Sequence, residues 1–338
     1  MKIAVFFQLF MMICLNSFLF GKKLNHLEEE GIFGAVKVKI EQEFLYDDEL
    51  GKIIKKLQAK NIYHYNRDGF LILWEIYDEA NKLVSEIKYS YDSNCNEKER
   101  VENNFQDNIC WRYQSDYTEK GNKKIEVIYH SKSSVFFEKL VYRYDEKGNE
   151  IEVLKYYSDG RLQARLVSEY DENGNKLVWA EYKGDGKLNW KQLYYYDQKE
   201  NQNVWYDYDG SGKIKEKNIF VLDEKKREKE MIRYNSQGDV EKRIVKNFDK
   251  EDRVVEEIIY NNENQMEWKW VTDYFENGKK KEEQEFNADG VLEVKTRWKY
   301  DEKGNPVLKE VFERVIDFGE ERFRMAGGNE IIYEYWEK

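Results

Sequence analysis

The chain has little proline, cysteine or histidine. A single proline, Pro306, stands among 338 residues, which include only three cysteines and three histidines. Because no Pro-, Gly- or Ser-rich linker divides the chain, one continuous array is favoured over two separate domains. The histidines (His26, His64 and His130) have no cysteine or carboxylate at a metal-ligand spacing. We interpret them as structural and expect neither a metal nor a cofactor.

The sequence also lacks a basic patch. The net charge is -11, and the run Lys279-Lys280-Lys281 is followed at once by Glu282-Glu283. A nucleic acid would be repelled by such a surface, so we expect no nucleic-acid partner. Charged residues make up 36% of the chain, but aromatics make up 16%, and disordered chains lack aromatics. The chain is therefore expected to fold.

The one long hydrophobic run is at the N-terminus. Lys2 precedes an apolar run from Ile3 to Leu15 that only Gln8 interrupts, and a small residue follows at Gly21. This pattern predicts an export signal, residues 1–21, and a periplasmic, cell-surface or secreted protein. Leu19 departs from the small residue expected before a cleavage site. An uncleaved anchor stays open, and it is the only membrane contact we expect.

Aromatic residues recur at a fixed interval through most of the chain. From Tyr144 the spacings alternate between 12 and 14 without a slip, which defines a 26-residue repeat. Thirteen of the fourteen positions are aromatic and Leu222 is the exception: Tyr144, Tyr156, Tyr170, Tyr182, Tyr196, Tyr208, Leu222, Tyr234, Phe248, Tyr260, Tyr274, Phe286, Tyr300 and Phe312. Upstream, from Tyr65, the same pattern is less regular.

Each repeated aromatic precedes a turn signal. An aspartate or asparagine often follows it directly, which suits the first position of a type I turn. Glycine stands four residues after it in nine cases, where a left-handed residue would close the turn as a bulge. These turn glycines are Gly148, Gly160, Gly174, Gly186, Gly212, Gly238, Gly278, Gly290 and Gly304. Each motif predicts a hairpin turn.

Between the turns, short segments alternate in polarity. In the segment from Leu162 to Tyr170, every second residue falls on one face and Arg165 and Glu169 fall on the other. We predict an all-β fold: an extended, twisted antiparallel meander of tandem 26-residue β-hairpin repeats that forms a curled single sheet. The array covers residues 63–312, with capping segments at 22–62 and 313–338. The stretch from Gly319 to Asn329 is expected to be loop.

Two cysteines of the mature chain fall at successive predicted turns. Cys95 takes the glycine place after Tyr91, and Cys110 follows the aromatic Phe105. Successive turns of a meander lie at opposite sheet edges, about 25 Å apart for an eight-residue strand. A disulfide needs α-carbons within about 7 Å, so these two cysteines are predicted not to bond to each other.

Three blocks resemble a known repeat signature. Residues 144–149, 170–175 and 300–305 are similar to the Y-D-x-x-G-[NR] motif of YD-repeat (Rhs-type) proteins, and the hairpin unit resembles MORN-like repeats. The resemblance covers about residues 60–312. It implies a secreted or surface all-β array that encloses, displays or binds something and has no catalytic residue in the repeat. The chain is far shorter than large Rhs proteins.

Candidate binding residues lie near one apolar row on the charged face. The row comprises Val167, Leu193, Ile219, Val245 and Val271, and we expect Trp179, Trp205 and Met231 to run beside it. Exposed indoles could stack on sugar rings or extended peptides, with Glu181 and Asp207 as polar neighbours. The alternative is that these tryptophans form the spine of the curled sheet.

The segment Asp207 to Ile214 follows the opening of an EF-hand loop, but Asn218 stands where a bidentate glutamate belongs. Because Tyr208 and Gly212 are in register with the repeat, we interpret it as a hairpin turn. The sequence thus favours an exported, non-catalytic binding or scaffold protein of the cell envelope, with a glycan or a protein as partner. Two alternatives stay open: a secreted carbohydrate-active enzyme that uses its many carboxylates, and a toxin-neutralising partner, which rests on family analogy alone.

Overall fold

The computed structural model describes residues 24–49, 52–130, 135–317 and 319–337. The predicted export signal, residues 1–21, lies outside these ranges. The elements are α1 (His26–Glu29), β1 (Val36–Glu49), β2 (Lys52–Tyr65), β3 (Leu71–Tyr77), β4 (Leu83–Tyr91), β5 (Glu97–Asn104), β6 (Ile109–Tyr117), β7 (Lys123–His130), β8 (Glu138–Tyr144), β9 (Glu150–Tyr157), β10 (Leu162–Tyr170), β11 (Lys176–Lys183), β12 (Leu188–Asp197), β13 (Gln202–Asp209), β14 (Ile214–Leu222), β15 (Glu228–Tyr234), β16 (Val240–Phe248), β17 (Val254–Tyr260), β18 (Met266–Tyr274), β19 (Lys280–Phe286), β20 (Leu292–Tyr300), β21 (Pro306–Asp317) and β22 (Glu320–Tyr335).

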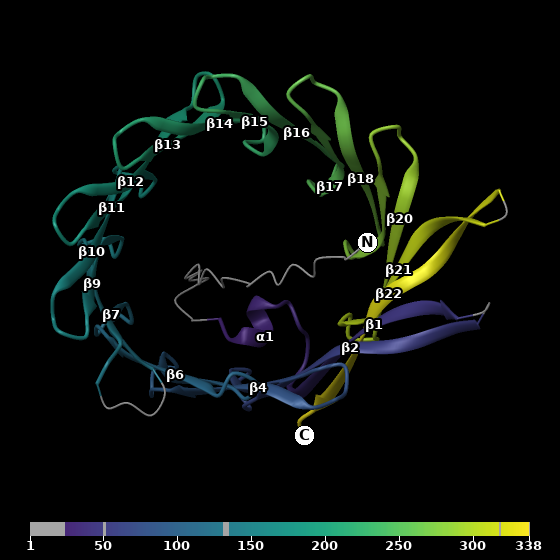
Figure 1. The fold of residues 1–338 in the computed structure, drawn as a ribbon, viewed down its shortest axis with the longest axis horizontal. Coiled ribbons are helices and arrows are strands. Elements are labelled where there is room, and N and C mark those ends of the chain that lie inside the picture. Colours follow the sequence, from purple (N-terminus) through teal and green to yellow (C-terminus); the bar gives the residue numbers. More distant parts are fainter. Residues whose placement is uncertain (1–23, 50–51, 131–134, 318, 338) are drawn as a thin grey trace.

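The described strands form one sheet that closes on itself. Consecutive strands pair antiparallel from β1 to β22, which confirms the predicted meander and its near absence of helix. The last strand then pairs with the first, in a register that includes Ile40 opposite Ile332. Figure 1 shows the result as a ring. A closed barrel leaves no free edge along this seam, which an open sheet would expose.

The predicted curled single sheet closes into a barrel, and the ends of the chain complete it. The segment from Gly319 to Asn329, expected to be loop, lies almost wholly in β22. Its pair Gly327-Gly328 runs close to two neighbouring strands: a β-carbon at Gly328 would stand 2.1 Å from the carbonyl oxygen of Lys309. Glycine permits this backbone approach, so two residues that resemble a loop signal in the sequence instead allow the ring to close.

The hairpin turns explain the recurring glycines. In the turn after Tyr144, the Asp145 N–H donates to the carbonyl oxygen of Asn149 (3.0 Å), and the Gly148 N–H donates to that of Asp145 (3.1 Å). The Asn149 N–H also donates to the Asp145 carboxylate at 2.8 Å. Gly148 has φ 92°, a left-handed conformation that glycine adopts without strain.

Each of these turns also contains a bulge that reverses the alternation of faces. After Tyr170, for example, Glu169 pairs with Val178 but Tyr170 pairs with Lys176, so Leu177 is an extra residue. Because directly opposed side chains share a face, Trp179 lies on the face of its partner Ser168 and of Tyr170. A sequence-based assignment that continues the every-second-residue alternation through such a turn therefore places the side chains on the wrong face.

The N-terminal segment identifies which face is internal. Leu27 of α1 and the following Ile32 pack with Val36, Tyr65 and Leu71 in the buried core, and α1 lies inside the ring (Figure 1). The face of Tyr65 is therefore the inner face. Because directly paired residues share a face, this assignment extends from strand to strand around the ring. The inner face is the one that bears the tyrosines at the ends of the even-numbered strands.

These inner tyrosines connect successive hairpins. Eight inner-face tyrosine hydroxyls donate to the backbone carbonyl of the first residue of the preceding odd-numbered strand, at 2.6–3.2 Å. The donors are Tyr91, Tyr117, Tyr144, Tyr170, Tyr196, Tyr274, Tyr300 and Tyr333. The hydroxyl of Tyr65 donates to Glu30 instead. The tyrosine therefore recurs because each unit needs one hydroxyl to bond its neighbour.

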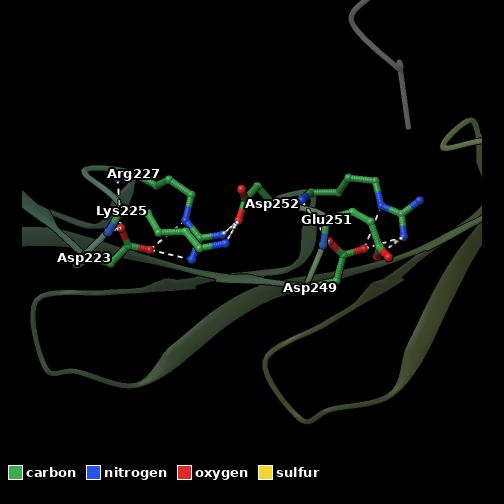
Figure 2. A network of polar contacts seen from close by, with 7 residues as sticks. Asp223, Lys225, Arg227, Asp249, Glu251 and Asp252 are labelled. Atoms are coloured by element: carbon green, nitrogen blue, oxygen red, sulfur yellow. Dashed lines mark hydrogen bonds and ion pairs between the residues drawn. The ribbon is translucent and has the colours of Figure 1, made fainter.

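Two units without the hydroxyl are connected by charge instead. Their aromatic positions hold Leu222 and Phe248, and their turns hold Arg227 and Arg253 in the asparagine place. Arg227 bonds Asp223 in its own turn (2.7 Å) and Asp252 in the next turn (2.5 Å). Lys225 reaches Asp252 at 2.6 Å (Figure 2). An ion pair between turns thus stands where the other units have a tyrosine hydroxyl.

The second aromatic of each unit lies on the outer face. In several units a lysine or arginine from the preceding strand stands directly opposite and over the ring, as Lys191 does at 5.0 Å from Tyr208 and Arg243 does at 5.1 Å from Tyr260. Such cation–π pairs contribute about 0.5–1 kcal/mol each at exposed sites. The two aromatics of the repeat thus have different structural roles.

The two cysteines lie at opposite ends of β5. Cys95 holds the left-handed position of the turn before this strand, with φ 61°. Cys110 lies in β6 opposite Asn103, near the far end of β5, rather than in the turn where it was expected. This separation agrees with the predicted absence of a disulfide between them.

The hydroxyl connection predicts opposite effects of two substitutions. Tyr274→Phe removes the bond to the Val254 carbonyl, and we expect it to lower the free energy of unfolding by about 1 kcal/mol. Phe248→Tyr places a hydroxyl where the repeat geometry directs it to the Glu228 carbonyl, and should be neutral or stabilising. Chemical denaturation measures both. Equal destabilisation by the two variants would contradict the assigned role of the hydroxyl.

Closure predicts that strands can be removed only in pairs. Deleting Asn235 to Tyr260 removes β16 and β17 as a unit, and the remaining 20 of 22 strands can still close antiparallel. Deleting Asn235 to Phe248 removes β16 alone, and an odd number of alternating strands would bring β1 and β22 together parallel. We expect the longer deletion to melt cooperatively and the shorter one to aggregate. Better folding of the shorter deletion would contradict the hairpin unit.

Candidate functional site on the inner wall

All four predicted site residues lie on the inner face of two nearby strands. Trp179 and Glu181 belong to β11, and Trp205 and Asp207 belong to β13, with β12 between them. The prediction that these tryptophans run beside the apolar row of the charged face was wrong. Trp205 opposes Tyr194 and Asn218, and Met231 opposes Phe220, all on the tyrosine-bearing face. A turn bulge accounts for the error at Trp179, whereas the longer turn between Asp197 and Gln202, which has no bulge, accounts for it at Trp205.

The first aromatic group pairs two tryptophans. Trp179 meets Trp190 edge to face, with ring centroids 4.7 Å apart. The Lys176 ammonium lies 5.2 Å from the Trp179 ring, and burial lowers the pKa of this lysine despite the nearby Glu150. Glu181 stands opposite Trp190 and accepts a hydrogen bond from the Asn189 amide at 2.5 Å. Trp190 was not singled out in the sequence.

The second group centres on Trp205. Its ring lies 5.5 Å from Tyr194 and 4.4 Å from Phe220, and 38% of the residue remains exposed. A polar row, Gln192 opposite Asp207, separates it from the Trp179–Trp190 pair. Trp179 and Glu181 therefore belong to the first aromatic group, Trp205 to the second, and Asp207 to the polar row between them.

The Trp205 group continues as a stripe across the inner wall. From Phe220, directly opposed residues lead through Met231, Ile244 and Ile259 to Trp268, one on each successive strand. The inner stripe, as we call Tyr194, Trp205, Phe220, Met231, Ile244, Ile259 and Trp268, crosses strands β12 to β18. At the usual strand spacing it is about 29 Å long. Trp268 is 42% exposed, so both ends of the stripe present indole surface.

A shallow hollow lies in the middle of the stripe. It encloses about 140 Å³, and its lining includes Phe220, Met231, Ile244, Lys246 and Glu257. The floor is apolar, and the charged side chains of Lys246 and Glu257 stand at one side, 3.8 Å apart. Glu228 and Glu230 complete the lining, so charged side chains surround an apolar floor.

The other margin of the stripe carries a polar trio. Asn218 is 5% exposed and donates to Glu216 at 2.5 Å, and the Arg233 guanidinium lies 3.3 Å from the same carboxylate. Glu216 also stands directly opposite Asp207. Carboxylates, an amide and a guanidinium thus border the aromatic surface and offer both donors and acceptors.

Burial and charge act together on Tyr194. Burial first and the carboxylate of Asp207 second raise the pKa of Tyr194 to about 12. Its hydroxyl donates to Gln192 at 2.5 Å. At the far end of the wall, burial raises the pKa of Glu285, which stands opposite Trp270. These shifts indicate that the wall is partly shielded from water.

The described residues contain no group of three or more His, Cys, Asp or Glu side chains that could hold a metal ion. In the EF-hand-like segment, Asp209 binds the N–H groups of Ser211 and Lys213 (2.8 and 3.0 Å), and Gly212 has φ 81°. That geometry is the repeat turn. Within the same described ranges, no helix has the length and apolar character needed to span a membrane.

No family model and no curated protein matches this chain. Among solved structures, it is similar to the Photorhabdus luminescens Tc holotoxin pore with mutation TccC3-D651A (12% identity, TM-score 0.34, 84% of this chain and 16% of that one). It is also similar to TcdB2-TccC3 (11%, 0.35, 85% and 18%) and to a porin-like protein from Bacteroides uniformis (10%, 0.31, 88% and 96%). The chain thus spans under a fifth of the toxin chains. These TM-scores carry no argument about function, and the repeat architecture rests on this chain's own strand register.

The site geometry predicts that the pKa of Tyr194 depends on the charge of Asp207. Asp207→Asn removes a negative charge near the Tyr194 hydroxyl, so the pKa of Tyr194 should fall below 12 but stay above 10, because burial remains. Carbon-13 NMR of labelled tyrosine, assigned with Tyr194→Phe, measures the shift. Glu169→Gln, which changes an outer-face carboxylate, is the control. An unchanged Tyr194 pKa in Asp207→Asn would mean that the two side chains do not face each other.

Proposed function

We propose that this chain is an exported, non-catalytic binding protein of the cell envelope, and that the inner wall of its ring binds a linear glycan. The observation that carries the proposal is the inner stripe, whose aromatic ends remain exposed within a concave surface. Sugar rings present apolar faces that stack on indoles. Trp205 and Trp268 are more exposed than most other residues of the inner face, which are only half-exposed.

The polar margins fit the same ligand class. Hydroxyl groups at the edge of a sugar both donate and accept hydrogen bonds, and Asp207, Asn218 and Arg233 supply complementary groups beside Trp205. The length of the stripe favours a chain of several sugars over a single one. A ligand that crossed seven strands would distribute its contacts over several hairpin units.

Export is part of the proposal and rests on the N-terminal apolar run. A binding ring of this kind would act outside the cytoplasm, where polymeric envelope glycans are found. The mass of the mature protein recovered from the envelope or medium tests this separately from ligand binding.

A carbohydrate-active enzyme is the second candidate, and the opposition of Asp207 and Glu216 beside Trp205 favours it. Retaining and inverting glycosidases place two carboxyl groups on either side of the scissile bond. Glu216, however, is already engaged by Asn218 and Arg233. Because the Glu216 carboxylate is occupied by these two partners rather than directed at a substrate, we place binding first.

A glycan array with the mature chain tests the proposal. We expect binding to linear oligosaccharides, and Trp205→Ala should weaken it by about 1–2 kcal/mol, roughly tenfold. Trp336→Ala is the matched control, because this tryptophan does not belong to the inner stripe. Equal loss in both variants would contradict the site. Release of shorter sugars that Asp207→Asn and Glu216→Gln abolish would favour the enzyme instead.

A further inference from the structure

One lysine of the chain shows what the inner wall offers to a positive charge. Lys39 stands directly opposite Tyr63 of β2, and its ammonium lies 4.5 Å from the centroid of that ring. The same ammonium lies 2.7 Å from the Glu30 carboxylate. Lys39 is nevertheless buried. An aromatic face and a carboxylate both attract an ammonium group, and together they offset the water that burial removes.

A second lysine lies in a setting of the same kind. The Lys176 ammonium lies 5.2 Å from the centroid of the Trp179 ring. Burial lowers the pKa of this lysine, and the nearby Glu150 carboxylate opposes that effect. At two positions of the inner wall, therefore, an ammonium group of the chain lies against an aromatic ring with a carboxylate nearby.

Trp270 is surrounded by the same groups. It stands directly opposite Glu257 of β17 on one side and Glu285 of β19 on the other. The exposed Trp268 lies on the same face, and the two indole rings are 6.4 Å apart. In the part of the chain that the structure describes, no lysine or arginine lies over either ring. A position for a positive charge is thus present here without a cation of the chain over the indoles.

The Glu257 carboxylate is only weakly engaged. Its ion-pair partner Lys246 lies at 3.8 Å, whereas a charge-assisted hydrogen bond is about 2.7–2.9 Å long. Glu257 also borders the hollow of the inner stripe, together with Glu228 and Glu230, and Glu230 is paired with Arg243. The net charge of -11 adds a long-range attraction for cations. This end of the stripe therefore favours a positively charged ligand.

A similar arrangement occurs near the other end of the stripe. Trp190 of β12 stands between Glu181 of β11 and Asp209 of β13. Glu181 already accepts a hydrogen bond from Asn189, and Asp209 accepts bonds from the N–H groups of its own turn. Of the two positions, the one around Trp270 therefore has the carboxylate with fewer hydrogen-bond donors.

A protonated amino sugar combines the two properties that this surface selects. Its ring presents an apolar face that stacks on an indole such as Trp268, and its amine is attached directly to that ring. The amine can then reach Glu257 while the ring contacts the indole. A lysine side chain instead carries its ammonium on a flexible four-carbon stem and has no ring to stack.

We propose that the glycan bound by the inner stripe is a linear chain of amino sugars with free, protonated amines, and that Glu257 and Glu285 receive one of these ammonium groups beside Trp270. This inference rests on the proposed function, because it names the class of glycan that the same wall binds. It adds a prediction that the proposed function does not make, namely that acetylation of the amines weakens binding.

Three linear hexasaccharides with the same linkage test this inference: those of glucosamine, N-acetylglucosamine and glucose. They share the sugar ring, but only the first carries amines that can be protonated. Isothermal titration calorimetry with the full mature chain at low salt measures each one. We expect the glucosamine hexamer to bind about tenfold more tightly than the other two. A lysine hexapeptide is included to show whether positive charge alone is sufficient.

Variants of the carboxylate and its lysine should act in opposite directions. Glu257→Gln should weaken binding of the glucosamine hexamer about fivefold to tenfold and leave binding of the glucose hexamer unchanged. Lys246→Met removes the ammonium of the chain that competes for Glu257, and should strengthen binding about threefold. Glu169→Gln, on the outer face, is the matched control. Thermal melts verify folding, and Glu285→Gln is the second test if Glu257→Gln does not fold.

The possible outcomes separate this inference from the proposed function. Equal binding of the three hexasaccharides, weakened by Trp205→Ala, would overturn the inference and leave the proposed function intact. Binding of none of them would overturn both. Tighter binding of the lysine hexapeptide than of the glucosamine hexamer would overturn the inference in favour of a basic peptide. Unchanged binding of the glucosamine hexamer by a folded Glu257→Gln variant would overturn the assigned position.

Discussion

The structure depends on one backbone constraint, the left-handed residue that closes each hairpin turn. Gly148 and its equivalents let the chain reverse in five residues and leave one extra residue in the following strand. That extra residue reverses the alternation of faces at each turn of this rim. As a result, Trp179, which follows Tyr170 across such a turn, points into the ring as that tyrosine does.

The turns alone do not hold successive hairpins together, so further contacts between hairpins are required. Tyrosine hydroxyls do so on the inner side of one rim, and cation–π pairs do so on the outer face. Where Leu222 and Phe248 cannot donate, Arg227 forms an ion pair with the next turn. Exposed ion pairs contribute less than a buried hydrogen bond, so these units are expected to be the weakest part of the ring.

The ring also explains why few side chains are fully buried. A sheet of 22 described strands closes around a space too wide for its own side chains to fill, so most inner residues stay half-exposed. The principal buried cluster forms where α1 and the following segment pack inside the ring. A large inner surface with exposed indoles and paired polar margins follows from that geometry, and the proposed glycan site draws on it.

The sequence by itself determined the local architecture. Aromatic spacing, turn residues and alternation specified the antiparallel hairpins, because each depends on contacts within about 26 residues. Closure, by contrast, depends on β1 meeting β22, nearly 300 residues apart, and Gly327-Gly328 resembled a loop until that pairing placed them. Trp179 and Trp205 were recognised, but their face was not, since a bulged residue reverses it for Trp179 and the turn between Asp197 and Gln202 reverses it for Trp205. The inner stripe also includes Tyr194, Phe220 and Trp268, which the sequence did not indicate. Their alignment across neighbouring strands exists only in the tertiary structure.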